Sequence, residues 1–150
     1  MSARSPMSIR LLSWNVNGLR SAMKKGFAAW ATDCGADVIG LQETRLCEPD
    51  APVEALSAYP NQYYNGGDRP GYAGTAILSK AEPAAVWQGF DSAFAHPDEG
   101  RVLTADCGPF FFVTAYVPNA QDELKRLDYR RQFNADFEAY LLDLERTKPV

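Results

Sequence analysis

Histidine is nearly absent from this chain of 150 residues, in which His96 is the single example. A catalytic triad built on histidine, an HExxH zinc site and a Cys/His zinc site all need histidines at fixed spacings, so the sequence excludes these sites. A P-loop and a GxGxxG motif are absent as well, and nothing indicates a nucleotide cofactor. His96 stands beside Pro97 in a segment of loop composition, and we interpret it as a solvated loop residue.

Cysteine and long apolar runs are scarce too. The three cysteines are an odd number at wide spacings, without a CxxC pair, so we expect reduced and buried thiols at Cys34, Cys47 and Cys107. No window is apolar over the length of a membrane span, and no apolar run follows Arg4 as in a secretory signal. We therefore expect no membrane partner and a cytoplasmic location, associated with the nucleoid in a bacterium or nuclear in a eukaryote.

A large charge of one sign is also lacking. The chain has 15 basic and 19 acidic residues, and its formal net charge of −4 is not typical of a general nucleic-acid binder. The acidic excess lies in the second half, because residues 1–75 contain seven residues of each sign, whereas residues 76–150 contain eight basic and twelve acidic residues. The charge therefore leaves room for a nucleic-acid surface in the first half.

Apolar residues, in contrast, are plentiful. Hydrophobic residues make up 46% of the chain, which is enough for one folded domain with a core, and the length is too short for two domains. The sequence has no repeats, linkers or low-complexity stretches. We predict a disordered amino terminus at residues 1–8, followed by a single domain at residues 9–150.

The amino-terminal third has the pattern of a strand, a helix and a second strand. Residues 9–14 are short and largely apolar and lead into a turn sequence. Apolar residues from 19 to about 34 recur every three or four positions, which predicts an amphipathic helix that Gly26 weakens. Residues 37–43 have the composition of a second buried strand. This unit favours an α/β fold.

The rest of the chain alternates short strands with turn sequences and then forms a long helix. The expected elements are a short helix and an extended segment within 48–65, strands at 75–79 and 85–89 joined by a turn at Glu82-Pro83, a hairpin of 101–106 and 110–116 around Gly108-Pro109, and the longest helix at 122–146. Pro149 stops this helix, and Val150 resembles the first residue of another strand. We therefore expect the chain to be cut short.

Polar residues stand where the predicted buried strands end. Asn15 and Asn17 follow the first strand, Glu43 ends the second, and Tyr116 and Asn119 follow the Phe-rich strand. A carboxylate with amide groups nearby suits a hard cation such as Mg²⁺. By pattern alone, the asparagines also fit ordinary turns and the glutamate fits a solvated strand end, so both interpretations stay open.

Six motifs, in this order along the chain, carry a resemblance to a known family. They are Ser13–Arg20 (SWNVNGLR), Gln42–Arg45 (QETR), Gly71–Gly74 (GYAG), Glu99–Val102 (EGRV), Thr114–Ala120 (TAYVPNA) and Arg126–Arg130 (RLDYR). The chain resembles the exodeoxyribonuclease III-like apurinic/apyrimidinic endonucleases of the endonuclease/exonuclease/phosphatase superfamily. The first two motifs alone also fit the superfamily's phosphoinositide phosphatases and sphingomyelinases, whereas the later motifs narrow the resemblance to the DNA-repair branch.

The resemblance implies a fold and a set of site residues. The fold is a four-layer α/β sandwich, of which we expect about half, with one sheet's inner face exposed and hence aggregation, a partner chain or loose folding. Glu43 is implied as the ligand of Mg²⁺, with Mn²⁺ as an alternative, Asn15 as its neighbour on the phosphate or metal, and Asn17 as a weaker contributor. Tyr116 is implied to contact the scissile phosphate, and Asn119 the phosphate of the abasic nucleotide. The implied contacts with the DNA backbone are Arg20, Lys24, Lys25, Tyr72 and Arg101, although the first three also fit a solvated helix face.

The implied activity is Mg²⁺-dependent hydrolysis of the phosphodiester 5′ to an abasic site in double-stranded DNA. DNA with 3′-blocked ends is a further implied substrate, and 3′–5′ exonuclease and 3′-phosphodiesterase action are further implied activities. Asp122 stands where some relatives insert an arginine wedge into the duplex. The family's Gly-Asp-Leu/Met-Asn motif, which activates water, would begin after Val150. We therefore expect the isolated chain to be inactive or barely active and to need a carboxy-terminal half. The alternatives are a phosphatase or phospholipase of the superfamily and a non-catalytic DNA-binding module.

Overall fold

The amino-terminal unit has the predicted order of strand, helix and strand. In the computed structural model, which describes residues 8–150, β1 (Leu11–Asn15) runs parallel to β2 (Val38–Gln42). The single helix predicted at residues 19–34 is two helices, α1 (Leu19–Lys24) and α2 (Phe27–Asp33), because Gly26 between them takes a left-handed conformation with φ 96°. Of the predicted amino-terminal segment 1–8, all but residue 8 lies outside the described residues.

Within residues 8–150, seven strands form two sheets. In the first sheet, β4 (Thr75–Ser79) lies antiparallel between β2 and β3 (Asn61–Asn65), giving the order β1-β2-β4-β3. In the second, β5 (Ala85–Gln88), β6 (Val102–Asp106) and β7 (Phe111–Ala115) are antiparallel in sequence order. The hairpin predicted around Gly108-Pro109 is confirmed as β6 and β7. The turn at Glu82-Pro83 does not join a hairpin, since β4 and β5 belong to different sheets.

Short helical turns and one long helix complete the chain. The 3₁₀ turns are Glu48–Asp50, Glu54–Leu56 and Asp122–Leu124. The long helix, α3, covers Leu127–Glu145 and is the longest element, as predicted, although it begins five residues later than position 122 because the chain turns sharply at left-handed Glu123 and Leu124. No helix within residues 8–150 is long and apolar enough to cross a membrane.

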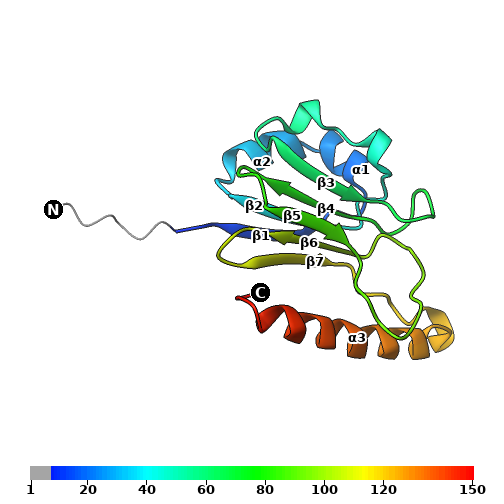
Figure 1. Cartoon of the computed structure of the whole chain (residues 1–150). Helices are drawn as coiled ribbons and strands as arrows, with labels where there is room; N and C mark the ends of the chain where they lie inside the picture. The colour runs from blue at the N-terminus through cyan, green and yellow to red at the C-terminus, as the bar shows by residue number, and fades with distance from the viewer. Residues whose placement is uncertain (1–7) are drawn as a thin grey trace.

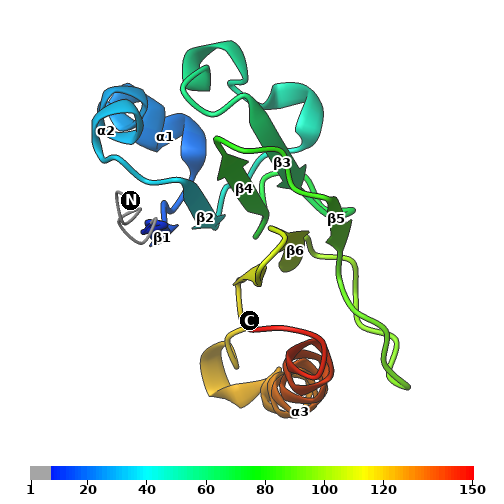
Figure 2. The same ribbon diagram turned by 60° about the vertical axis from the view of Figure 1, so that its left-hand side comes forward.

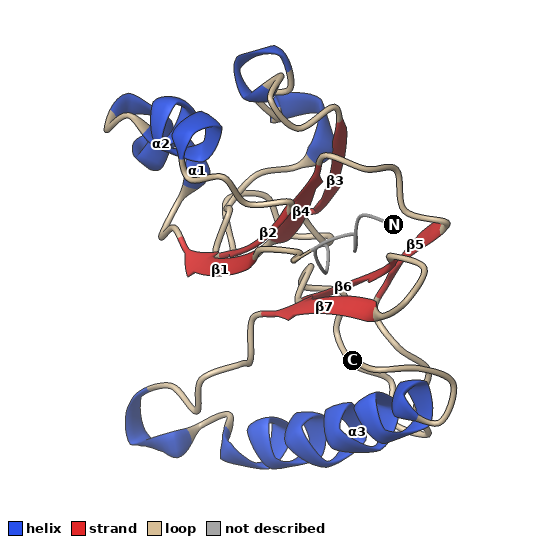
Figure 3. Cartoon of the chain, turned by 90° about the vertical axis from the view of Figure 1, so that its left-hand side faces the viewer, coloured by secondary structure: helices blue, strands red, loops and turns tan. Residues whose placement is uncertain are grey.

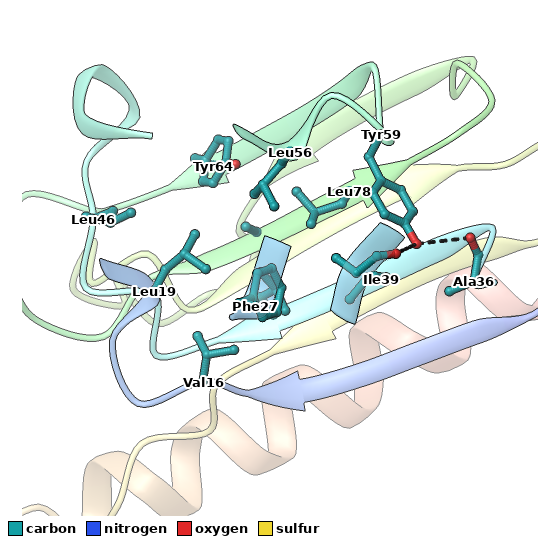
Figure 4. Close-up of a cluster of buried hydrophobic side chains, with 13 residues drawn as sticks. Val16, Leu19, Phe27, Ala36, Ile39, Leu46, Leu56, Tyr59, Tyr64 and Leu78 are labelled. Carbon is teal, nitrogen blue, oxygen red and sulfur yellow. Dashed lines mark hydrogen bonds between the residues drawn. The ribbon is translucent and has the colours of Figure 1, made fainter. Parts of the chain in front are cut away.

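The elements stack as α1 and α2, the first sheet, the second sheet and α3, which confirms the four-layer α/β class (Figure 1). The main core lies between the first sheet and the two helices (Figure 4). Its largest fully buried side chain, Tyr59, donates from its hydroxyl to the carbonyl oxygens of Ala31, at 3.0 Å, and Ala36, at 3.1 Å. A smaller core joins the inner faces of the two sheets through Val38, Ile77, Leu103 and Ala105.

The outer face of the second sheet is covered by α3 (Figures 2 and 3). Phe133 is the buried residue of this helix, and much of the remaining contact is aromatic. Tyr140 accepts a hydrogen bond from Trp87 Nε1 at 2.8 Å, and its ring stacks on Phe90. At the end of the helix, Lys148 binds the Asp106 carboxylate.

The expectation of an uncovered inner sheet face is wrong. The chain contributes strands to both sheets, so their inner faces pack against each other. Exposed apolar side chains gather instead around edge strand β1, where Leu11 is 43% exposed, Trp14 is 42% exposed, and Trp30 of α2 contacts Trp14 with ring centroids 4.7 Å apart. The facing sides of the two sheets are therefore covered, and the exposed apolar side chains lie at the edge of the first sheet.

Candidate active site

The candidate site lies where β1, β2 and β7 end. Asn15 is the last residue of β1, Glu43 directly follows β2, and Tyr116 directly follows β7. Asn15 and Glu43 are neighbours because β1 and β2 are parallel and in register up to the pair of Asn15 and Gln42. Tyr116 comes from the second sheet, which packs on β2. Residues from both sheets therefore meet at one edge of the sandwich.

Glu43 is the centre of this arrangement. Its Oε1 accepts from Asn15 Nδ2 at 3.0 Å, its Oε2 accepts from Arg45 Nη2 at 3.2 Å, and the Tyr116 hydroxyl also donates to the carboxylate. Burial raises the pKa of the Glu43 carboxyl, but these three hydrogen bonds and the charge of Arg45 outweigh it, so the pKa lies below its usual value. Glu43 is thus held as a carboxylate.

Tyr116 is held in its protonated form. Burial, the hydrogen bond to Glu43 and the negative charge of Glu43 raise the pKa of the Tyr116 phenol to about 12. Near neutral pH its hydroxyl is a donor, directed toward the carboxylate and available to an oxygen that arrives beside it.

The backbone around Glu43 is both unusual and well supported. Asn17, Glu43 and Arg45 have left-handed φ angles of 47°, 52° and 54°. Such conformations cost on the order of 1 kcal/mol or more for residues other than glycine and are found where the surroundings enforce them. Here the loops after β1 and β2 continue to pair, with Gly18 N donating to Glu43 O at 2.7 Å and Leu19 N donating to Thr44 O at 2.9 Å. This pairing fixes the carboxylate and the amides relative to one another.

Arg45 joins the two asparagine positions to Glu43. Its Nη2 also donates to Asn17 Oδ1 at 2.6 Å, and Asn15 Oδ1 accepts from the Asn17 backbone at 3.1 Å. The sequence predicts no role for Arg45, although this residue lies in the QETR motif. A basic residue two positions after a strand-end carboxylate is the signal that could have identified it.

The residues present fit a divalent cation with few protein ligands. Within residues 8–150, no three Asp, Glu, His or Cys side chains converge as a metal cage, and Glu43 is the carboxylate that Asn15 and Arg45 contact. Mg²⁺ is commonly held by one or two carboxylates together with waters and substrate phosphate, which matches this donor set. Asn15 and Asn17 turn their oxygens to other partners here and orient Glu43 and Arg45, so direct ligation by either amide stays a prediction.

Asn119 lies outside this hydrogen-bonded group. It is exposed in the segment after β7, and its Oδ1 accepts from the backbone of Gln121 at 3.2 Å. Its contact with the abasic nucleotide stays a prediction. Asp122, at the position of the arginine wedge of some relatives, is also exposed.

The predicted DNA contacts divide into two kinds. Arg20, Lys24 and Lys25 are exposed on α1 and directly after it, and Arg20 pairs with Asp50 at 2.9 Å. This placement fits both contacts with the DNA backbone and a solvated helix face. Arg101, in contrast, is 6% exposed and is bound to partners inside the protein, among them the carbonyl oxygen of Tyr116 at 3.0 Å and the hydroxyl of Tyr72 at 3.2 Å. Direct contact of Arg101 with DNA stays a prediction, and the structure gives it a supporting position behind both tyrosines.

Known proteins with this arrangement are found by sequence and by structure. The endonuclease/exonuclease/phosphatase family matches residues 12–150. The chain is 43% identical to the DNA repair nuclease APEX1 of Danio rerio over 146 residues, which are 95% of this chain and 47% of that protein. It is 40% identical to an exodeoxyribonuclease of Bacillus subtilis over 143 residues, which are 95% of this chain and 56% of that protein.

Solved structures have the same arrangement of layers. An AP endonuclease from Archaeoglobus fulgidus matches with a TM-score of 0.73 at 25% identity, over 89% of this chain and 51% of that chain. A Neisseria 3′ phosphatase, NExo, bound to a product DNA hairpin, matches in fold with a TM-score of 0.74 at 24% identity, over 93% of this chain and 54% of its own. The chain thus spans about half the length of the relatives it matches. Since the family match extends over almost all of its residues, the chain belongs to the endonuclease/exonuclease/phosphatase family.

Proposed function

We propose that this chain is the metal-binding half of a DNA-repair nuclease that hydrolyses the phosphodiester 5′ to abasic sites in double-stranded DNA. The observation that carries the proposal is the convergence of Glu43, Asn15 and Tyr116 at the strand ends, with Glu43 ionised and Tyr116 protonated. The names of the relatives, a DNA repair nuclease and an exodeoxyribonuclease, support DNA as the substrate.

Each residue has a defined part in this proposal. Asn15 and Arg45 hold the Glu43 carboxylate in place, and the Tyr116 hydroxyl donates to an oxygen of the scissile phosphate as negative charge builds there. Glu43 would hold a divalent cation, Mg²⁺ or Mn²⁺, which would supply stabilisation of the charge on the phosphate and on the leaving 3′-oxygen. Asn119 binds the phosphate of the abasic nucleotide, and Arg20, Lys24 and Lys25 bind the DNA backbone.

Water activation is the part that these residues do not supply. We propose that it comes from the carboxy-terminal half that the relatives possess, and that full activity needs this half. A Gly-Asp-x-Asn motif directly after Val150 in the coding sequence would agree with this division of the machinery, whereas an unrelated continuation would contradict it.

An incision assay on a duplex with one abasic site tests the proposal. We expect Mg²⁺-dependent incision 5′ to the site from the chain extended by its downstream half, little or none from the 150 residues alone, and none with EDTA. Glu43→Ala in the extended protein should abolish incision, whereas the matched control Glu48→Ala, a glutamate in an exposed 3₁₀ turn, should leave it unchanged.

Three results would contradict this function. Robust turnover by the 150 residues alone would show that the second half is not needed. Hydrolysis of inositol phosphates in place of DNA would favour a phosphatase of the superfamily. Salt-dependent duplex binding that survives Glu43→Ala, without any incision by the extended protein, would favour a non-catalytic module.

A further inference from the structure

A largely buried carboxylate, which the mechanism does not use, contacts the arginines that bind the two site tyrosines. Glu99, in the loop before β6, has a side chain that is 12% exposed. Its Oε2 accepts from Arg101 Nε at 2.6 Å, and its Oε1 accepts from Arg126 Nη2 at 2.9 Å. The side chains of the two arginines are only 5% and 21% exposed. One carboxylate therefore holds two guanidinium groups in fixed positions.

Both arginines converge on a single hydroxyl. Arg101 Nη2 and Arg126 Nη1 each donate to the Tyr72 oxygen at 3.2 Å. A phenol oxygen has two acceptor positions and one proton, so these two bonds fill its acceptor capacity. The remaining function of the Tyr72 hydroxyl is to donate, and a phosphate oxygen, which only accepts, is the partner that suits it.

Arg101 also fixes Tyr116. Its Nη1 donates to the Tyr116 carbonyl at 3.0 Å, the Tyr116 amide donates to the Arg101 carbonyl at 2.8 Å, and its guanidinium lies 5.1 Å from the centre of the Tyr116 ring. The carboxylate that aligns Arg101 thus acts on both tyrosines.

The position of Glu99 is itself held by close backbone packing. A Cβ on Gly100 would come within 2.4 Å of the Asn65 carbonyl, and a Cβ on Gly67 would come within 2.5 Å of the Glu99 carbonyl carbon. Thr75 Oγ1 donates to the Gly100 carbonyl at 3.0 Å. The loop before β6 is therefore locked against the loop after β3, which gives Glu99 a rigid base.

We propose that Glu99 is a positioning residue that acts through Arg101 and Arg126 to present the Tyr72 hydroxyl as an obligate donor to a phosphate and to hold Tyr116 beside Glu43. The role as a phosphate donor rests on the proposed nuclease function, whereas the alignment of the tyrosines does not. A purely structural ion cluster would stabilise the loop without these effects.

The first measurement needs no DNA. The 150-residue chain with ¹³Cζ-labelled tyrosine is recorded by NMR, and the signals of Tyr72 and Tyr116 are assigned with the Phe variants. Glu99→Gln should shift both signals while the Tyr59 signal stays, and the control Glu123→Gln, which removes a glutamate that is 82% exposed, should shift neither. Unchanged Tyr72 and Tyr116 signals in folded Glu99→Gln would overturn the proposal, whatever the outcome of the incision assay.

The second measurement is binding of a duplex with a tetrahydrofuran abasic analogue, followed by fluorescence anisotropy. Glu99→Gln removes a negative charge, so charge alone predicts tighter binding, whereas loss of one aligned donor predicts binding that is about tenfold weaker. Tyr72→Phe should weaken binding similarly in the native chain and add little in Glu99→Gln, because both variants remove the same contact. Tighter binding by Glu99→Gln or additive losses would overturn the assignment of Tyr72 as the aligned phosphate donor.

A milder variant covers the case in which Glu99→Gln does not fold. Arg126→Lys keeps the positive charge and the hydrogen bond from Arg101 to Glu99, but it removes the second donor to the Tyr72 hydroxyl. The Tyr72 signal should shift and the Tyr116 signal should stay. A shift of Tyr116 alone, or of neither, would contradict the proposed arrangement.

Discussion

The two sheets are held in different ways. The first sheet has a mainly aliphatic core toward α1 and α2 and a second core toward the other sheet, so all five residues of β4 are buried. The second sheet meets α3 through aromatic rings and a few polar links, and β5 contains no buried residue. Sequence composition accounts for this difference, because β2 and β4 are largely apolar, whereas seven of the 19 residues of α3 are charged.

The candidate active site combines residues from both regions. Glu43 and Asn15 extend from the tightly packed sheet, whereas Tyr116 and Asn119 extend from the more loosely packed one. We infer that the carboxylate is the more rigid partner and that the tyrosine depends on the cluster of Glu99, Arg101 and Arg126, which ties its loop to the first sheet. The following predictions test the contrast between the regions.

The largest effect is expected from truncating the aliphatic core. Leu78→Ala removes a fully buried side chain of β4 and should lower the free energy of unfolding by about 3 kcal/mol. Leu144→Ala, the same change at a half-buried position of α3, should lower it by about 1 kcal/mol. Denaturant unfolding of both variants gives the comparison. Equal losses would show that the two regions are packed equally well.

A smaller effect is expected from deleting a buried hydroxyl in each region. Tyr59→Phe leaves two carbonyl groups without their donor. Tyr140→Phe leaves Trp87 Nε1 without its acceptor and Thr104 Oγ1 without its hydrogen-bond partner. Each substitution should therefore cost about 1 kcal/mol. The two substitutions should destabilise different parts of the chain. Hydrogen exchange should accelerate throughout the first sheet in Tyr59→Phe but mainly in α3 in Tyr140→Phe.

Tyr63→Phe is the control, because Tyr63 is a half-buried residue of β3 and no hydrogen bond of its hydroxyl is observed within residues 8–150. It should leave stability and exchange nearly unchanged. Faster exchange of the first sheet in Tyr140→Phe would mean that α3 and that sheet unfold together, against the contrast drawn between them.

Most elements and two of their pairings could be predicted from the sequence, but the division of the strands between two sheets could not. The hairpin at Gly108-Pro109 and the parallel pair of β1 and β2 follow from local composition and spacing. The separation of β4 from β5 does not, since a turn such as Glu82-Pro83 has the same composition whether it closes a hairpin or crosses between sheets. The break at Gly26 required its backbone angle, because glycine also occurs within continuous helices.

The site could be predicted in part for a similar reason. Asn15, Glu43 and Tyr116 are identified by their places at strand ends, and the structure brings them together. Glu99 and Arg126 look like solvated loop charges in the sequence, because their burial arises from contacts between distant segments. Their membership in two motifs was the one available signal.

The smallest effect concerns the far end of α3 and its dependence on pH. The hydrogen bond from Lys148, followed by that from the Gly108 amide, lowers the pKa of the Asp106 carboxyl below its usual 3.8. A carboxyl with a lowered pKa in the folded state stabilises above the unfolded pKa, and this contribution is lost as the pH falls through the lower folded value. We therefore expect exchange of the last amides of α3 to gain protection up to about pH 4 and then to level off, with the effect absent in Asp106→Asn. The control Asp122→Asn, at an exposed position, should keep the native dependence of exchange on pH. If Asp106→Asn also kept it, the ion pair of Lys148 and Asp106 would not be what holds this helix end to the second sheet.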